Sequence, residues 1–423
     1  MYQKTTLDNG LRIITETLPQ TRSVCLNFFI GAGGRYENLT ESGLSHFIEH
    51  LCFKGTERHA TTKEISEKIE CVGGLINGAT DREMTIYWTK VAQPHFDIAM
   101  DLMVDILHHS RFDAQDVEKE RNVIIEEINT ALDSPHERVA MLIDEVMWPN
   151  QPVGMDVAGT RKTVGSINRQ QILDYFNTQY VPGNTVISIA GNIEHERAVS
   201  MLNNALADWT DGATTPKPWI KADDRQDKPR FSIEKRPTEQ SHICLSVRGY
   251  SSTHRDRYIL DMINVILGKG MSSRLFINIR EKLSVAYDVH SYATHFIDSG
   301  ALTVYAGVDP KRTSIAIDAL LKELATFKND PVPAAELTKC KELSKGRLLI
   351  RMEDTSNLSM WLGGQDLLKN YILTVDDVIS IIDSVTADDI QRVAQDIFVP
   401  EKLNASIVGP VDDHKQIEDI FTI

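Results

Sequence analysis

The segment SGLSHFIEHLCFKGT, residues 42–56, combines the apolar pattern of an amphipathic helix with two histidines. Four apolar residues recur with the spacing of one helix face: Leu44, Phe47, Ile48 and Leu51. This face is expected to pack into a core. His46, Glu49 and His50 fall on the opposite side, where the two histidines lie one helical turn apart. The polar side has two interpretations, a solvated surface or a metal site, and a metal site needs a third ligand from elsewhere in the chain.

The composition is that of a globular protein with an acidic surface. Of the 423 residues, 42% are hydrophobic and 25% are charged, and the net charge is −15. This length allows two or three domains with substantial cores. The strong negative charge argues against nucleic acid and against anionic lipid as partners. No apolar run reaches about 18 residues, so no segment is expected to cross a membrane.

The cysteines and the N-terminus favour a cytoplasmic protein. The five cysteines are scattered and odd in number, which suits a reducing compartment. The first residues carry no signal-segment pattern and instead predict two strands that are joined at Asn9 and Gly10. Cys52 follows His50 by two residues but lies nearer the apolar stripe. We therefore expect Cys52 to be a buried structural thiol rather than a fourth metal ligand.

The two halves of the chain resemble each other. Two pairs of segments carry this likeness: 24–34 with 243–252, and 167–193 with 385–411. The offsets between matching cysteines and matching prolines are 219 and 218 residues. Such agreement indicates the duplication of one ancestral domain. Val265 and Lys269 stand at the positions that duplicate His46 and His50, so the metal candidates occur once per chain.

The predicted fold class is α+β, with two homologous domains. Residues 1–210 form the first domain, the proline-containing stretch 211–229 forms a linker, and residues 230–423 form the second domain. Hairpins and long helices favour a largely antiparallel sheet covered by helices in each half. In the first half we expect strands near 3–17, 23–31, 83–91 and 185–190, and helices near 43–54, 62–72, 94–108, 113–131 and 168–178.

The segment DAQDVEKERNVIIEEINTAL, residues 113–132, offers a third ligand. On a helix, Glu127 and Glu120 share the apolar stripe of valines and isoleucines, whereas Glu126 projects away from it. A carboxylate that faces a core is unfavourable unless a cation or metal accompanies it. Glu127 is therefore the predicted third ligand. The alternative is a charged helix that is simply exposed to solvent.

The sequence HFIEH at 46–50 is an H-x-x-E-H motif, the signature of the inverted zincins. With Glu127 located 77 positions after His50, the chain resembles the pitrilysin/insulinase-type metallopeptidases. Two further segments match this family: GGLINGATDREMTIYW at 73–88 and REKLSVAY at 280–287. The resemblance runs from end to end and includes the duplication. The chain is similar to the roughly half-length bacterial members that are akin to the mitochondrial processing peptidase.

The resemblance implies a zinc metalloendopeptidase with one Zn²⁺ per chain. The implied ligands are His46, His50 and Glu127, which leave the fourth position of a tetrahedral site open, as in catalytic sites. Glu49 is the implied general base. Glu120, one helical repeat before Glu127, is expected to orient a ligand or share the charge of the site.

The resemblance also implies a set of substrate-binding residues: Asn77, Gly78, Ala79, Phe53, Arg280 and Tyr287. In the family, a peptide lies as an added strand on the open edge of the strand that matches 75–79. The family usually has alanine where this chain has Gly78. Phe53 matches an apolar wall for the residue after the cut, although it is equally a candidate core aromatic. Arg280 and Tyr287 are expected to donate hydrogen bonds to the substrate carbonyl and oxyanion.

The resemblance also bears on the assembly of the protein and leaves other functions open. Larger family members join four such domains into a chamber, with zinc in the first domain and the arginine–tyrosine pair in the fourth. For this chain we expect a homodimer, or a heterodimer with an inactive homologue, that cleaves short or unfolded peptides. The alternatives are a non-catalytic structural or partner subunit and a metal-dependent hydrolase of non-peptide substrates.

Overall fold

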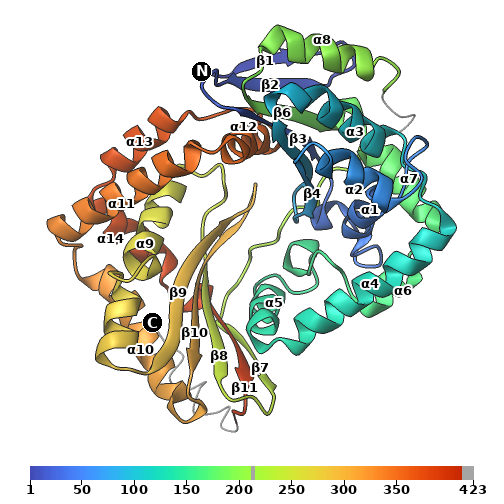
Figure 1. Cartoon of the computed structure of the whole chain (residues 1–423). Helices are drawn as coiled ribbons and strands as arrows, with labels where there is room; N and C mark the ends of the chain where they lie inside the picture. Colours follow the sequence, from blue (N-terminus) through green and yellow to red (C-terminus); the bar gives the residue numbers. More distant parts are fainter. Residues whose placement is uncertain (211–214, 412–423) are drawn as a thin grey trace. The chain divides into compact units, whose positions relative to one another are not determined.

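A computed structural model describes residues 1–210 and 215–411. Two sheets, each packed against helices, confirm the predicted α+β class (Figure 1). The described residues form two compact units: the first contains 1–128, 156–220 and 350–373, and the second contains 129–155, 221–349 and 374 onward. No helix in the described part of the chain combines the length and the apolar character needed to cross a membrane.

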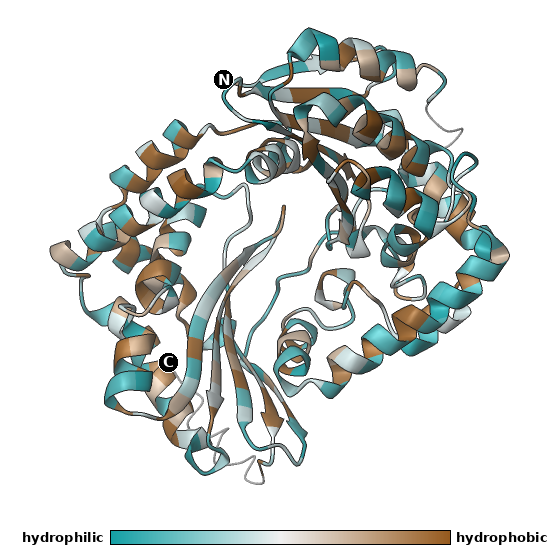
Figure 2. Ribbon diagram, in the orientation of Figure 1, coloured by the Kyte–Doolittle hydropathy of each residue, from teal (hydrophilic) through white to brown (hydrophobic). Residues whose placement is uncertain are grey.

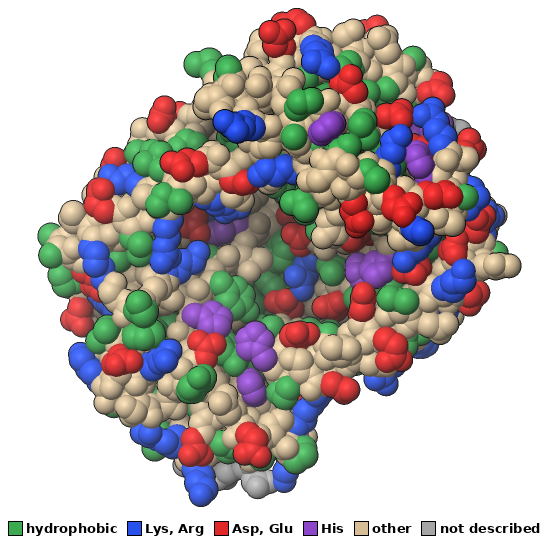
Figure 3. All heavy atoms as spheres, viewed as in Figure 1, with side chains coloured by type: hydrophobic (Ala, Val, Ile, Leu, Met, Phe, Trp, Pro, Cys, Tyr) green, Lys and Arg blue, Asp and Glu red, His purple; other side chains and the backbone are tan. Residues whose placement is uncertain are grey.

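The acidic excess is dispersed on the surface that is visible in Figure 3. There, aspartate and glutamate side chains alternate with lysine and arginine side chains. On that face the net charge of −15 therefore produces no continuous patch of one sign.

Six strands form the sheet of the first unit, in the order β1-β2-β6-β3-β5-β4. Neighbouring strands are antiparallel, except that β2 and β6 are parallel. Gly10 makes the β1–β2 turn with a φ of 83°, so the predicted hairpin is confirmed. The strands are β1 (Gln3–Thr6), β2 (Arg12–Thr17), β3 (Ser23–Ile30), β4 (Leu75–Thr80), β5 (Thr85–Ala92) and β6 (Thr185–Gly191).

The helices of the first half follow the apolar periodicity of the sequence. The five predicted helices are present, with ends that differ by a few residues, and the structure adds α5, α6 and α8. Figure 2 shows hydrophobic residues along the strands and on parts of the helices that cover them. The helices are α1 (Leu44–Cys52), α2 (Thr62–Glu70), α3 (Phe96–His108), α4 (Ala114–Asp133), α5 (Pro135–Met147), α6 (Arg161–Ser166), α7 (Arg169–Gln179) and α8 (His195–Ala205).

Five strands form the sheet of the second unit, in the order β7-β11-β8-β10-β9. The pairs are antiparallel, except that β7 and β11 are parallel. The strands are β7 (Arg230–Lys235), β8 (Ser241–Arg248), β9 (Ala286–His295), β10 (Gly300–Val308) and β11 (Leu403–Gly409). The helices of the second half are α9 (Arg257–Gly268), α10 (Thr313–Asn329), α11 (Ala334–Met352), α12 (Thr355–Lys369), α13 (Val375–Ser384) and α14 (Ala387–Ile397).

Helix α12 belongs to the second half of the sequence but packs on the sheet of the first unit, against β3 and β6 (Figure 1). Asn27 donates a hydrogen bond to Ser359 Oγ at 2.7 Å, and Ser359 in turn donates to the carbonyl of Ser188 at 2.8 Å. A Cβ at Gly363 would lie 2.1 Å from the ring of Phe29. Glycine therefore allows this helix to approach the sheet closely.

Helix α5 makes the reciprocal exchange, because it comes from the first half and packs on β11, β8 and β7 of the second unit. Ser406 donates a hydrogen bond to the carbonyl of Val139 at 2.7 Å. The two compact units thus differ from the expected domains, because residues 129–155 belong to the second unit and residues 350–373 belong to the first. Residues 215–229 of the expected linker contain no helix or strand, and residues 211–214 lie outside the described residues.

The duplication is visible in the elements themselves. Helix α14 and strand β11 begin 218 residues after α7 and β6, at 387 and 403 against 169 and 185. Each of the two helices starts with a capping box, Asn168 with Gln171 and Thr386 with Asp389. Strands β6 and β11 then pair antiparallel with the corresponding strands β3 and β8. Two homologous α+β halves are therefore confirmed.

Candidate metal and catalytic centre

Helix α1 presents His46, Glu49 and His50 from the first unit. Its apolar side is the predicted one, and four residues there are fully buried: Leu44, Phe47, Ile48 and Leu51. The helix is held by this face, so its polar face has a fixed orientation. Cys52 is also buried, and the hydroxyl of Tyr87 donates to its sulfur at 3.4 Å. The predicted burial of Cys52 is therefore confirmed, and this burial raises the pKa of the thiol to about 12.

Glu37 caps the start of α1, a contact that the sequence did not reveal. Gly43 precedes the helix with a φ of 97°, in the left-handed region. The carboxylate of Glu37 accepts hydrogen bonds from the backbone N–H of Ser45 at 2.6 Å and from that of Gly43 at 2.9 Å. Burial raises the pKa of the Glu37 carboxyl to about 7, although these hydrogen bonds act in the opposite direction.

Replacing Glu37 with glutamine is expected to change how stability depends on pH. Between pH 4.5 and about 7 the folded protein keeps a proton on Glu37 that the unfolded chain releases. The free energy of unfolding should therefore fall as the pH rises through this window, and Glu37→Gln removes that contribution. Urea unfolding should be measured at pH 5 and pH 7.5. The free energy of unfolding of wild type, relative to that of the variant, should be about 2 kcal/mol higher at pH 5 than at pH 7.5. A difference between the two proteins that is the same at both pH values would contradict this role.

Helix α4 brings the third predicted ligand to the two histidines. Glu127 Oε2 lies 3.5 Å from His50 Nε2 and 3.9 Å from His46 Nε2. The two Nε2 atoms are 3.2 Å apart. Among the described residues, these three make up the one group of at least three His, Cys, Asp or Glu whose ligand atoms all lie within 4.8 Å of one another.

The burial predicted for Glu127 is wrong. Its side chain is 48% exposed, whereas that of Glu120 is 7% exposed. The buried residues of α4 are Val117, Glu120, Ile124 and Ile128. This stripe is centred nearer Ile124 than the sequence argument assumed, which leaves Glu127 at its margin. The geometry of the donor atoms, not burial, therefore distinguishes Glu127.

The separations and chemistry of these donors fit a zinc ion. With zinc–nitrogen bonds of about 2.0–2.1 Å, the donors of a tetrahedral site lie about 3.3–3.4 Å apart. The separations of 3.2 and 3.5 Å are close to this value, and the third, 3.9 Å between His46 and Glu127, is longer. Two imidazoles and one carboxylate are also the donor set of a known class of catalytic zinc sites.

The surroundings of the two histidines support ligation through Nε2. Burial, with a smaller effect of His50, lowers the pKa of His46 to about 4, so its imidazole is neutral and has a free lone pair. His50 Nδ1 lies 3.2 Å from Glu120 Oε2, and Lys54 Nζ lies 2.8 Å from Glu120 Oε1. Burial alone would lower the pKa of His50, but Glu120, Glu127 and Glu49 outweigh it and raise that pKa. A hydrogen bond from Nδ1–H to Glu120 leaves the Nε2 of a neutral His50 with a free lone pair, as a metal ligand requires.

Glu49 lies beside these ligands but outside the ligand group. Thr80, on β4, donates a hydrogen bond from its hydroxyl to Glu49 Oε2 at 2.6 Å. Burial raises the pKa of the Glu49 carboxyl, and the hydrogen bond from Thr80 opposes this effect. A carboxylate in such a position is available for proton transfer rather than for ligation. Sequence reasoning missed Thr80, since nothing in the local pattern indicates which side of an edge strand meets α1.

Strand β4 forms the edge of its sheet beside α1. Asn77 and Ala79 are exposed, whereas Gly78 is half-buried and faces Glu49 and Phe53. Phe53 itself is half-buried at the end of α1, with its ring 5.9 Å from that of Tyr87. The described strand pairings occupy one side of β4, so its other main-chain edge is open to an added strand.

Arg280 and Tyr287 lie together in the second unit. Arg280 belongs to the π-helical segment η5 (Phe276–Lys282), and Tyr287 lies near the start of β9. The guanidinium of Arg280 is 5.7 Å from the ring centre of Tyr287, and that tyrosine is 75% exposed. Both residues line a cavity of about 710 Å³ in this unit. Their hydrogen-bond donors are therefore available to a ligand.

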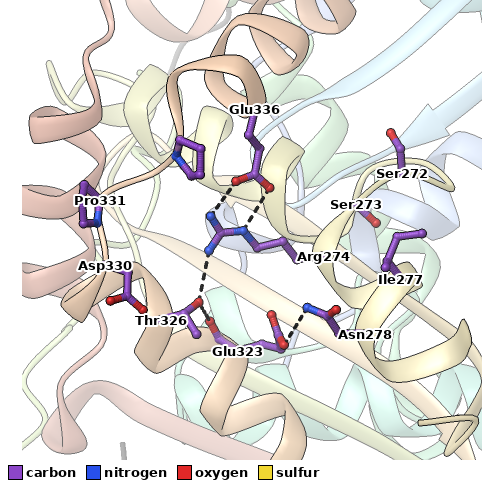
Figure 4. Close-up of a pocket in the computed structure, with 11 residues that line it drawn as sticks. Ser272, Ser273, Arg274, Ile277, Asn278, Glu323, Thr326, Asp330, Pro331 and Glu336 are labelled. Carbon is purple, nitrogen blue, oxygen red and sulfur yellow. Dashed lines mark hydrogen bonds and ion pairs between the residues drawn. The ribbon is translucent and has the colours of Figure 1, made fainter. Parts of the chain in front are cut away.

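Figure 4 shows a polar network around Arg274 and Asn278, which precede Arg280 in the chain. Arg274 makes two hydrogen bonds to the carboxylate of Glu336 on α11, at 2.7 and 3.1 Å, and a third to Thr326 on α10 at 3.1 Å. Asn278, within the π-helical segment, donates to Glu323 on α10 at 2.9 Å. The residues that make these contacts line a cavity of about 450 Å³. Their hydrogen bonds attach the π-helical segment and the residues before it to α10 and α11.

Comparison with protein families gives two matches, which follow one another along the chain. Residues 12–161 match the family described as insulinase (peptidase family M16), and residues 166–344 match the family described as peptidase M16 inactive domain. A Bacillus subtilis protein described as an uncharacterized zinc protease is 35% identical over 414 residues, which cover 97% of this chain and 98% of that protein. A Mycobacterium leprae protein with the same description is 32% identical, covering 98% of this chain and 93% of that protein.

Solved structures share the fold at lower sequence identity. A protease from Helicobacter pylori matches with a TM-score of 0.92 at 21% identity, and the match covers 96% of this chain and 99% of that chain. A Pseudomonas fluorescens structure described as a peptidase M16 inactive domain matches with a TM-score of 0.87 at 16% identity, over 98% and 99% of the two chains. At these identities the likeness shows the fold alone.

Proposed function

Because the chain belongs to peptidase family M16, the insulinase family, we propose that it is a zinc-dependent endopeptidase that cleaves short or unfolded peptides. The observation that carries this proposal is the convergence of His46, His50 and Glu127 beside the carboxylate of Glu49. In the proposal these three residues hold one zinc ion per chain. Such an ion acts as a Lewis acid and makes water nucleophilic near neutral pH.

Four other residues have proposed roles in peptide hydrolysis: Glu49, Glu120, Arg280 and Tyr287. Glu49 takes a proton from the attacking water and delivers it to the leaving nitrogen, a role worth about 10²–10⁴ in rate. Glu120 keeps His50 in the tautomer that leaves Nε2 free. Arg280 and Tyr287 donate hydrogen bonds to the substrate carbonyl as negative charge develops on it.

A peptide substrate is proposed to bind along β4. The free main-chain edge of Leu75–Thr80 supports this, because an added strand is bound by main-chain hydrogen bonds that tolerate many sequences. Asn77, Gly78 and Ala79 would contact this strand, and the half-buried ring of Phe53 offers an apolar wall beside Glu49.

The five cysteines are free thiols, which supports a reducing compartment such as the cytoplasm.

Zinc content measured together with cleavage of a quenched-fluorescence peptide tests the proposed function. The purified chain should contain one zinc per chain and should cleave the peptide, and a chelator should abolish cleavage until zinc is restored. Bound zinc without any peptide cleavage would favour a non-catalytic partner subunit. Cleavage of ester or amide substrates but not of peptides would favour a hydrolase of non-peptide substrates.

We also propose that the active form is a dimer, in which the zinc site of one protomer acts with Arg280 and Tyr287 of its partner. Within the described residues, the one candidate zinc site lies in the first unit, and Arg280 and Tyr287 lie in the second. A two-fold dimer would then contain two composite sites. A heterodimer with an inactive homologue is the alternative arrangement.

Mixing two inactive variants tests the composite site. Equal amounts of His50→Ala and Arg280→Ala, dissociated and reassembled, should recover about a quarter of wild-type activity, because half of the random dimers contain one intact site out of two. The matched control mixes His50→Ala with Glu49→Gln, which lie in the same half-site and should recover nothing. Recovery no greater than the sum of the separate variants would show that each site forms within one chain or that no dimer forms.

A further inference from the structure

Strand β4 has one side that faces α1 and another that is exposed. Along Leu75–Thr80 the exposure alternates, with Ile76, Gly78 and Thr80 half-buried and the residues between them exposed. Two of the half-buried residues, Gly78 and Thr80, contact or closely approach Glu49. The strand proposed to bind the peptide therefore also touches the carboxylate proposed to move the proton.

Thr80 holds one oxygen of this carboxylate. Its Oγ1 donates to Glu49 Oε2 at 2.6 Å, a short hydrogen bond typical of a charged acceptor. Glu49 has several rotatable bonds, and the apolar side of α1 does not restrict them because Glu49 lies on the opposite side. The hydroxyl of Thr80 is thus a side-chain contact that fixes the direction of this carboxylate, together with a hydrogen bond from the backbone of Thr80.

Gly78 restricts Glu49 from a second direction. A Cβ at position 78 would lie 2.8 Å from Glu49 Cγ, 3.0 Å from Glu49 Oε1 and 3.1 Å from Phe53 Cε2. The backbone of Gly78 is not in the left-handed region, so the effect of a side chain here is steric and not conformational. A methyl group at this position would press on side-chain atoms of Glu49 and Phe53 and not on the backbone of α1.

We infer that Thr80 is a positioning residue that sets where the carboxylate of Glu49 stands for proton transfer. The inference rests on the proposed role of Glu49 as general base. Because Thr80 acts through Glu49, its replacement should lower kcat and leave KM nearly unchanged, since the main-chain edge that binds the peptide is retained. Misplacement of a reacting group by about 1 Å costs about 10²-fold in rate.

Threonine-to-valine substitution tests the hydrogen bond, because it removes the hydroxyl and keeps the shape. Thr80→Val should lower kcat for the quenched peptide by about 10- to 100-fold, with zinc content and thermal stability close to wild type. Thr80→Ser keeps the hydroxyl and should restore kcat to within about threefold. The matched control is Thr85→Val on the paired strand, whose hydroxyl donates to the carbonyl of Ala32 and does not touch Glu49. Its kcat should stay near wild type.

Glycine-to-alanine substitution tests the steric contact. Gly78→Ala introduces the residue that the family usually has here and presses only on side-chain atoms of Glu49 and Phe53, so kcat should fall by no more than about threefold, again with zinc retained. The control is Gly346→Ala in α11, where a Cβ meets no atom within 4 Å, so kcat should not change. In the Glu49→Gln background, neither Thr80→Val nor Gly78→Ala should lower the residual rate further, because residues that act through one group are not additive.

The outcomes distinguish failure of this inference from failure of the proposed function. If wild type with zinc cleaves no peptide, or Glu49→Gln stays active, the proposed function is wrong. If wild type cleaves and Glu49→Gln does not, but Thr80→Val keeps full kcat, the positioning role is wrong. An equal loss of kcat in Thr80→Val and Thr85→Val would also overturn it, because the effect would then be general damage to the sheet.

Discussion

Replacing Glu49 with glutamine is expected to lower kcat for peptide cleavage by about 10³-fold while the chain keeps one zinc ion. Glutamine has nearly the same shape and can still accept the hydrogen bond from Thr80, which joins Glu49 Oε2 at 2.6 Å. It cannot take a proton from water, and loss of a general base costs about 10²–10⁴ in rate. Zinc should remain because Glu49 is not a member of the ligand group.

The measurement combines steady-state cleavage of a quenched peptide with metal analysis of the same samples. Glu67→Gln is the matched control, since Glu67 is an exposed helix glutamate that pairs with Lys63 on α2. This control should keep both zinc and turnover. Near-normal turnover of Glu49→Gln would mean that another group takes the proton.

Replacing Glu127 with glutamine is expected to weaken zinc binding by more than about 100-fold, whereas the neighbouring Glu126→Gln should have almost no effect. Glu127 contributes the oxygen that lies 3.5 Å from His50 Nε2, and Glu126 is absent from the ligand group. Glutamine removes the negative charge from that oxygen. Even residues that only support a zinc ligand cost 10- to 100-fold in affinity when mutated, so a direct ligand should cost more.

Competition with a chelator of known zinc affinity measures this difference. Both substitutions remove one negative charge from adjacent exposed positions on α4, so their general electrostatic effects should be similar. A difference in zinc affinity therefore reports ligation. Equal affinities in the two variants would remove Glu127 from the proposed ligand set.

The sequence predicted the parts of the site that depend on local spacing. The spacing of His46 and His50 by one helical turn and the apolar face of α1 both follow from helical periodicity, and the structure agrees with both. The hairpin at Gly10 and the duplication were also predictable, because turn residues and repeats are read directly from the chain. These features involve residues that are close in sequence or that recur at a fixed offset.

The sequence did not predict the parts of the site that depend on contacts between distant segments. Glu37 caps α1 from outside the helix, Lys54 pairs with Glu120, and Thr80 reaches Glu49 from another element. Periodicity also failed to locate the margin of the buried stripe on α4, so the predicted burial of Glu127 is wrong. A helical pattern gives the width of an apolar face but not which residue at its border meets solvent.

The exchange of α5 and α12 also escaped prediction, because amphipathic character does not identify the sheet that a helix will cover. Each sheet is completed by a helix from the other half of the chain. Either half expressed alone would therefore lack one covering helix and would expose the apolar sheet surface where Gly363 now meets Phe29, or where α5 now meets β11.

This exchange of α5 and α12 makes each half of the chain depend on the other for folding. Among the described residues the candidate zinc ligands lie in one half only, yet each half needs a helix from the other to cover its sheet. A single cut between the halves should leave two fragments that remain associated, because each fragment holds a helix buried on the sheet of the other. The second half is therefore needed for folding of the first, independently of any role in binding substrate.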